Sequence, residues 1–182
     1  MVFEGDNLSK INLNTFNGCS ALSSIELPES LEKIEYNAFD DCSALKSIVI
    51  PDKVTYIGEG AFNYCTGLQE AYIGDVTEIA AKAFAECTAL KTVVIGKSIQ
   101  RIGDQAFNTR SSWDQMTLEK ITVLFDDIAS GSFPVLESGS RGVFPKPGGW
   151  DLVSYKIYVP KGTKAEYQKN WSDYSSLIVE MQ

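Results

Sequence analysis

The residues that could carry out chemistry in this chain are four cysteines and two adjacent pairs of aspartates. The cysteines are Cys19, Cys42, Cys65 and Cys87, the pairs are Asp40-Asp41 and Asp126-Asp127, and the 182 residues include no histidine. A thiol or hydroxyl nucleophile usually needs a neighbouring base such as histidine. Adjacent residues on an extended segment point in opposite directions, so each aspartate pair fits a solvated turn better than an acid–base site. We therefore predict a protein that is not an enzyme.

Composition and charge narrow the function further. The sequence lacks the signature motifs of phosphate-binding loops, serine hydrolases and zinc proteases. Its 16 basic and 24 acidic side chains give a formal net charge of -8, which repels nucleic acid and anionic membrane surfaces. No apolar run reaches the roughly 18 residues of a membrane-spanning helix. We expect no nucleic-acid partner and no membrane insertion of this segment.

The elements that must position these residues follow from a repeat. Phenylalanine precedes each cysteine by three residues, at positions 16, 39, 62 and 84, and another stands at 107, so the steps are 23, 23, 22 and 23. A fixed period of this size is typical of a solenoid, in which one unit cannot bury its own apolar face and stacks on its neighbours. The repeat therefore predicts the architecture, although it does not identify a ligand.

Within this repeat the cysteines have a structural interpretation. Residues at the same point of successive turns stack about 4.8 Å apart with parallel side chains, whereas a disulfide needs Cβ atoms about 3.8 Å apart and converging directions. Zinc ligands usually come in close pairs such as C-x-x-C, often with histidine. We therefore favour buried free thiols that pack as small apolar side chains over disulfides or a metal site, and expect no cofactor.

Each turn contains three apolar clusters, as residues 39–61 illustrate. The alternation of Leu45, Ile48 and Ile50 with outward residues predicts a short strand that pairs in parallel with its copies. Val54 and Ile57 predict a second short extended segment. The Ala-Phe-x-x-Cys cluster predicts a helical or irregular turn with the phenylalanine in the core.

The pattern C-x-x-L-x-x-I-x-I-P-x-x-[LV]-x-x-I-x-x-x-A-F resembles the BspA-type leucine-rich repeat of bacterial surface proteins, common in Bacteroides and its relatives, and the likeness covers Leu8 to Phe107. It implies a β-rich, leucine-rich-repeat-like, right-handed superhelix of 23-residue turns with short parallel strands. The ordinary leucine-rich repeat has an asparagine after the first strand, which this chain replaces with Ser30, Lys53 and Ser98.

The domain organisation is expected to be one packed unit with two parts. Residues 1–136 form the solenoid, which begins in the middle of a repeat, so we expect the native protein to continue in the N-terminal direction. Residues 137–182 form an irregular loop, a last strand and a C-terminal cap. Ile128 and Phe133 are expected to mark one more shortened turn before the loop at residues 137–150.

The cap is predicted from the last thirty residues. Ile157 to Pro160 supply a strand of the repeat type, and Thr163 with Glu166 has the spacing of a capping box for a short helix through Asn170. Trp171, Tyr174 and residues 177–179 then close the end of the solenoid.

Two surfaces could bind a partner. Stacking aligns the outward residues of the first strand of each turn, and exposed apolar stripes often mark protein-binding surfaces; the alternative is that β-branched residues are simply good strand formers. This face comprises Ser47, Val49, Glu70, Tyr72, Thr92 and Val94. A second candidate is a loop site of Trp113, Phe144 and Trp150, whose rings could bind a sugar or peptide, or instead fold over the open end of the solenoid.

The family resemblance implies a non-enzymatic, surface-exposed or secreted bacterial module for protein recognition or adhesion to host or microbial macromolecules, with its signal or lipoprotein segment removed. The partner would be an unknown protein, such as a host matrix or surface protein. A glycan is also a possible partner. The alternatives are an architectural spacer that projects another domain and carbohydrate binding by the C-terminal aromatic loops.

Overall fold

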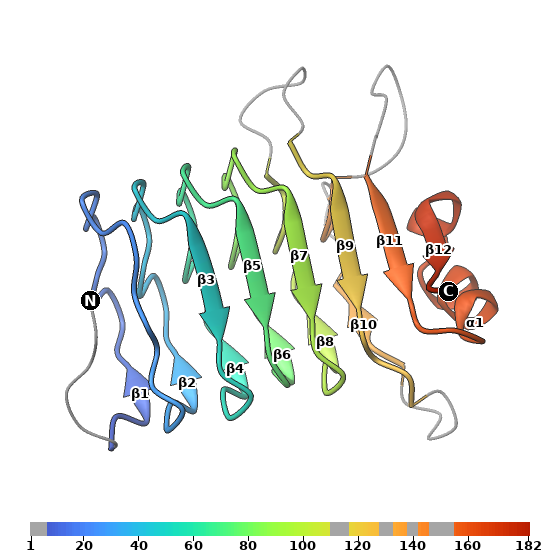
Figure 1. Cartoon of the computed structure of the whole chain (residues 1–182), viewed down its shortest axis with the longest axis horizontal. Helices are drawn as coiled ribbons and strands as arrows, with labels where there is room; N and C mark the ends of the chain where they lie inside the picture. The colour runs from blue at the N-terminus through green and yellow to red at the C-terminus, as the bar shows by residue number, and fades with distance from the viewer. Residues whose placement is uncertain (1–6, 110–116, 128–132, 138–141, 146–154) are drawn as a thin grey trace.

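The chain forms a solenoid in which the strands of two parallel sheets follow one another along the long axis of the molecule (Figure 1). The computed structural model describes residues 7–109, 117–127, 133–137, 142–145 and 155–182. Within these residues, each sheet has six strands. The long-strand sheet, in chain order, contains β3 (Ser47–Ile50), β5 (Glu70–Ile73), β7 (Thr92–Ile95), β9 (Lys120–Val123), β11 (Lys156–Val159) and β12 (Ile178–Glu180). The short-strand sheet contains β1 (Lys10–Ile11), β2 (Lys33–Ile34), β4 (Tyr56–Ile57), β6 (Glu78–Ile79), β8 (Arg101–Ile102) and β10 (Val135–Leu136).

Between residues 31 and 102 the strands form where the sequence predicts them, because their apolar residues alternate. In β3 and β5 the burial alternates between exposed and buried residues along all four positions. Ile48 pairs with Ala71 and Ala71 with Val93, so the inward residues of successive turns stack in register. This period of two is what holds one face of each strand in the core.

The third side of each turn, around the Ala-Phe pair, is joined to its neighbour by hydrogen bonds although it is not a strand. Phe39 N–H donates to the Ala61 carbonyl at 2.7 Å, and Phe62 N–H donates to the Ala83 carbonyl at 2.7 Å. Left-handed residues such as Asn37 (φ 50°) precede this pair in each turn. They belong to the turn that the sequence predicts there, and this turn also forms a third regular connection between successive repeats.

A column of stacked phenylalanine rings fills the core. The Phe39 and Phe62 centroids lie 4.9 Å apart with an interplanar angle of 5°, and both residues are fully buried. Phe84, Phe107 and Phe144 continue the column. The ring spacing follows the inter-strand spacing of about 4.8 Å, so the sheets and the column impose the same repeat distance on the chain.

Three of the four cysteines lie beside this column as free, fully buried thiols. Each Sγ–H donates to the carbonyl of the phenylalanine one turn earlier: Cys42 to Phe16 at 3.2 Å, Cys65 to Phe39 and Cys87 to Phe62, both at 3.1 Å. The neighbouring Cys65 thiol, together with burial, raises the pKa of Cys42. The prediction of buried thiols is wrong for Cys19, which is exposed, because no described turn stacks on its outer side.

The last turn of the solenoid uses different residues from those predicted. Leu136, not Ile128, pairs with Ile102 in the short-strand sheet, and Phe144, not Phe133, stacks on Phe107 at 5.4 Å. Ile128 lies outside the described residues. Residues 142–145, expected in an irregular loop, thus include the Ala-Phe position of a further turn, since the Phe107 N–H donates to the Val143 carbonyl at 2.8 Å.

The C-terminal cap consists of α1 (Lys164–Asn170), the 3-10 helix η2 (Ser172–Leu177) and β12. The helix has the predicted end, but the capping box is wrong: Thr163 makes no side-chain cap to the helix, and its hydroxyl instead donates to the Pro160 carbonyl at 2.6 Å. The hydroxyl is therefore already engaged by the turn that precedes the helix.

Aromatic side chains of the cap satisfy backbone carbonyls at the end of the solenoid. Trp171 Nε1 donates to Pro134 at 3.1 Å, Tyr167 to Phe125 at 2.9 Å and Tyr174 to Phe144 at 3.1 Å. Burial raises the pKa of Tyr174 to about 12. A ring with one polar atom suits this position, because it covers the apolar end and pairs with carbonyls that no further strand would reach.

Candidate protein-binding face

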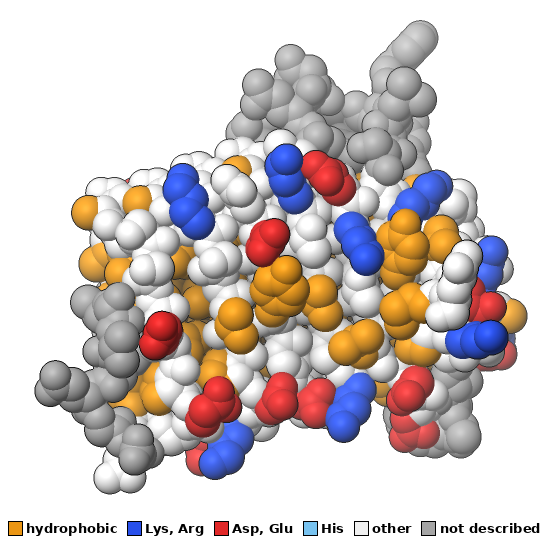
Figure 2. All heavy atoms as spheres, in the orientation of Figure 1, with side chains coloured by type: hydrophobic (Ala, Val, Ile, Leu, Met, Phe, Trp, Pro, Cys, Tyr) orange, Lys and Arg blue, Asp and Glu red, His pale blue; other side chains and the backbone are white. Residues whose placement is uncertain are grey.

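The register of the long-strand sheet aligns one outward residue from each strand into a single row. Val49 pairs with Tyr72, Tyr72 with Val94, Val94 with Thr122, and Thr122 with Tyr158. We call these five residues the outward row. In Figure 2 hydrophobic side chains form a line across the middle of this face. The row crosses the strands, so each residue comes from a different turn of the solenoid.

The outward row is unevenly exposed. The exposed fraction is 63% for Val49 and 40% for Tyr72, while Thr122 is 8% exposed and Val94 and Tyr158 are half-buried. The neighbouring inward residues Ile48 and Ala71 are almost completely buried. Val49 and Tyr72 therefore place apolar surface in solvent that contributes nothing to the core.

A parallel row of polar residues lies two positions earlier on the same strands. The pairing aligns Ser47 with Glu70, Glu70 with Thr92 and Thr92 with Lys120. The Tyr72 hydroxyl donates to Glu70 Oε2 at 3.3 Å, and the Glu70 carboxylate raises the pKa of Tyr72. All six residues of the predicted binding face thus lie on β3, β5 and β7 with outward positions in register.

The cation of Lys120 connects the two rows at the far end of the face. Its Nζ lies 4.9 Å from the centroid of the Tyr158 ring, within the range of a cation–π contact. Tyr158 is not among the residues predicted for the face, although its place in the final strand motif could have indicated it.

The second predicted site, in the C-terminal loops, is corrected for one residue. Phe144 is fully buried, and its ring stacks on Phe107 and meets Tyr174 edge-on at 5.5 Å. Its ring is therefore part of the core and is not offered to a sugar or peptide, as the capping alternative proposed. Trp113 and Trp150 lie outside the described residues.

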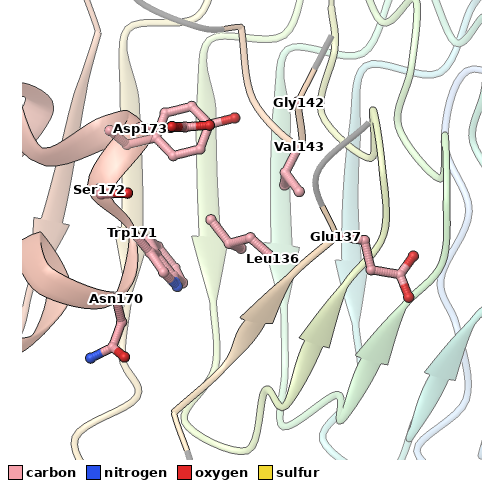
Figure 3. Close-up of a pocket in the computed structure, with 9 residues that line it drawn as sticks. Leu136, Glu137, Gly142, Val143, Asn170, Trp171, Ser172 and Asp173 are labelled. Carbon is pink, nitrogen blue, oxygen red and sulfur yellow. The ribbon is translucent and has the colours of Figure 1, made fainter. Parts of the chain in front are cut away.

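A pocket of about 240 Å³ opens between the last turn and the cap. Figure 3 shows Leu136 and Val143 on one side and Trp171 with Asp173 on the other. The Glu137 carboxylate at its rim accepts a hydrogen bond from Arg101 at 3.1 Å. Nothing in the sequence indicates this pocket, because its two walls lie about thirty residues apart in the chain and meet only when the cap folds back.

The acidic pairs lie at or near the surface of the solenoid. The Asp40 carboxylate accepts a hydrogen bond from Asn63 Nδ2 at 3.1 Å, and burial raises the pKa of Asp40. Asp41, in the left-handed region with φ 56°, and Asp126 are exposed. Among the described residues, no group of three potential ligands could hold a metal ion.

Comparison with known proteins supports a bacterial repeat architecture. The model of the BspA type leucine rich repeat region matches the chain in six copies over residues 2–114. No curated protein sequence matches the chain. In the described part of the chain, no helix has both the length and the apolar character needed to cross a membrane.

Six chains of solved structures match this one, including the following three. A T. pallidum leucine rich repeat protein has 28% identity and a TM-score of 0.53 over 68% of this chain and 63% of that one. The pneumococcal vaccine antigen PcpA has 21% identity and a TM-score of 0.69 over 100% of this chain and 41% of that one. A leucine rich cell surface protein of Faecalibacterium prausnitzii has 24% identity and a TM-score of 0.52 over 84% and 52%. The chain spans less than two thirds of the length of each.

Proposed function

Because the chain belongs to the family of BspA-type leucine-rich repeat proteins, we propose that it is a non-enzymatic recognition module, displayed on a bacterial cell surface or secreted, that binds another protein through its long-strand sheet. Leucine-rich repeat proteins generally bind proteins, and no catalytic family is indicated for this chain. The F. prausnitzii structure is described as a cell surface protein and the pneumococcal one as a vaccine antigen, which supports the proposed location.

The observation that carries the proposal is the exposed apolar part of the outward row. Val49 and Tyr72 are 63% and 40% exposed on adjacent strands, and Val94 continues them on β7. Neighbouring apolar side chains in solvent reduce solubility unless a partner covers them, so a continuous row of them is typical of a binding surface. Ser47, Glu70 and Thr92 beside the row would form its polar rim.

A binding screen with matched variants tests this function. The protein is immobilised and probed with purified host matrix proteins, host and bacterial surface proteins, and glycans. Each binder is then measured against the triple variant Val49→Ser/Tyr72→Ala/Val94→Ser. We expect a protein binder whose affinity falls at least tenfold with this variant, because a few central apolar side chains carry most of the energy of an interface.

The matched control changes exposed apolar residues elsewhere on the solenoid. Leu13, Tyr36 and Val135 are 65%, 50% and 58% exposed, and the variant Leu13→Ser/Tyr36→Ala/Val135→Ser should bind like the unmodified protein. Equal loss in both variants would contradict a specific face. A screen without any binder would favour the architectural spacer, and a glycan bound equally well by the face variant would favour carbohydrate recognition.

A further inference from the structure

We propose that the partner of the outward row is an amphipathic α-helix that lies along the row, across the strands, with acidic side chains on one flank and basic side chains on the other. This inference rests on the proposed function, since it names the class of partner for the same face. It follows from three properties of the face: its width, its spacing and the distribution of charge on its two sides.

The apolar part of the face is one residue wide. Val49, Tyr72 and Val94 are each flanked along their own strand by a polar or charged outward residue, Ser47, Glu70 or Thr92. A partner that covers the row without burying charges must also be apolar along a single line. An amphipathic helix presents such a line through residues spaced three and four apart.

The spacing of the row also fits a helix. Successive residues of the row lie on adjacent strands, about 4.8 Å apart, and a helix advances about 5.4 Å per turn. One apolar side chain per helical turn can therefore contact one residue of the row per strand over several strands. In an extended peptide, side chains on the same face are about 6.6 to 6.8 Å apart. This spacing no longer matches the spacing of the row after two strands.

The balance of charge differs between the two sides of the row. Beside the amino-terminal ends of the strands lie exposed Lys46, Lys91, Lys120 and Lys156, accompanied by Glu70 and Glu119, with Lys91 bound to Glu119 at 3.3 Å. Just beyond the carboxyl-terminal ends, four acidic residues lie among three basic ones: Asp52, Asp75, Asp126 and Asp127 with Lys53, Lys97 and Lys161. Asp75 is 3.8 Å from Lys97. Figure 2 shows basic side chains mainly above the hydrophobic line and acidic ones mainly below it.

This difference in charge determines which charged residues each flank of the partner helix should carry. Acidic residues on the flank that faces the lysines and basic residues on the flank that faces Asp52 and Asp75 would place opposite charges together on both sides. A second copy of this chain is a poorer occupant, because each copy carries a net charge of -8.

Designed helical peptides test the proposal directly. The first probe has leucine at positions spaced three and four apart, glutamate on one flank and lysine on the other. Two controls keep the leucines but place lysine or glutamate on both flanks, and a third keeps the first composition with two central prolines that prevent a helix. Binding is measured by fluorescence anisotropy at low and high salt.

We expect the mixed-flank helix to bind at least tenfold more tightly than the two single-charge helices and the proline peptide, with an affinity that falls as salt rises. In the charge-reversed variant Lys46→Glu/Lys91→Glu/Lys120→Glu both flanks are acidic, so the lysine-flanked helix should become the tightest probe. The Leu13→Ser/Tyr36→Ala/Val135→Ser variant should keep the original order of affinities. Circular dichroism verifies that each variant is folded.

The outcomes separate this inference from the function on which it rests. If the proline peptide binds as well as the helix, or the charge pattern of the flanks has no effect, the helical partner is wrong. Dimerisation of the protein through the row, detected by analytical ultracentrifugation and abolished by Tyr72→Ala, would also overturn it. The proposed function itself fails only if no natural protein binder depends on Val49, Tyr72 and Val94.

Discussion

At the scale of single residues, the repeat assigns the same structural task to the same position in every turn. The cysteine is the clearest case, since Cys42, Cys65 and Cys87 each donate a hydrogen bond to a phenylalanine carbonyl one turn earlier. A small apolar residue would fill the same space but remove this bond, and the carbonyl would keep only the backbone N–H of the cysteine three residues later in its own turn. The thiols therefore combine core packing with a link between turns.

The thiols should differ sharply in reactivity. Cys19 is exposed, whereas Cys42, Cys65 and Cys87 are fully buried, and the Cys65 thiol together with burial raises the pKa of Cys42. Since the thiolate is the reactive form, we expect Ellman's reagent to modify one thiol per folded chain at neutral pH, and all four cysteines after denaturation in urea. The Cys19→Ala variant should show no fast reaction; a remaining fast thiol would contradict the burial of the other three.

The Asp40 carboxyl group should make the free energy of unfolding depend on pH in the acidic range. Burial raises its pKa above the ordinary 3.8 despite the hydrogen bond from Asn63, so the folded state binds the proton more tightly than the unfolded state. Stability contributed by this group therefore increases as pH falls through the raised pKa towards 3.8, and the ionised form is a cost at neutral pH.

The variant Asp40→Asn tests this sign. We expect the free energy of unfolding of the variant, relative to the unmodified protein, to be higher at pH 7 than at pH 3, as measured by urea denaturation at both values. Any hydrogen bond that asparagine fails to make affects both measurements alike. A difference that is equal at the two pH values would show that the carboxylate is not destabilised in the folded protein.

At the scale of elements, each strand is only two to four residues long, and the phenylalanine column joins the strands of successive turns. The ring centroids of Phe62 lie 4.9 Å from those of both Phe39 and Phe84. No single turn can bury its own ring, so each turn is stabilised mainly by its two neighbours. Removal of one ring therefore affects three turns.

The variant Phe62→Ala should lower the free energy of unfolding by about 3 to 5 kcal/mol, because it removes a fully buried ring and leaves a cavity between two stacked rings. Tyr36→Ala is the control, since Tyr36 is 50% exposed, and should change stability by no more than about 0.5 kcal/mol. Urea denaturation of both variants compares them. Similar values for the two variants would contradict a column that holds the turns together.

At the scale of the whole molecule, the solenoid and its cap share one core. The buried apolar residues form a continuous cluster from Ile11 to Ile178, and β11 and β12 extend the long-strand sheet beyond β9. We propose that residues 1–136 and 137–182 fold as one cooperative unit, because the cap covers the end of the phenylalanine column.

A single unfolding transition is the expected result. In the variant Trp113→Phe/Trp150→Phe, Trp171 is the remaining one of the three tryptophans and reports on the cap, where it is 2% exposed. Its fluorescence and the far-ultraviolet circular dichroism should change at the same urea concentration. A cap transition at lower urea, with the β signal intact, would show that the cap unfolds independently.

The sequence predicts most of the solenoid because every turn repeats the same local information. The period of the phenylalanines and cysteines sets the register, and the alternation around Ile48 and Ile50 indicates which side of the strand is buried. It fails for the last turn, where the period is lost: the true members, Leu136 and Phe144, are separated from the preceding copies by longer connections. Periodicity cannot identify a residue whose spacing has changed.

The outward row, too, was predictable from the sequence in part and depended on the tertiary structure for the rest. The alignment of Val49, Tyr72 and Val94 could be derived from the period alone, because parallel strands in register place equivalent residues side by side. Their unequal exposure, the low exposure of Thr122 and the contact of Lys120 with the Tyr158 ring depend on neighbours in other turns, as do the cap pocket and the exposure of Cys19. By itself, the sequence determined the repeat, its strands and its core, since these depend on local spacing. Only the tertiary structure decided how the ends of the solenoid are closed and which side chains the surface exposes, since these depend on contacts between residues far apart in the chain.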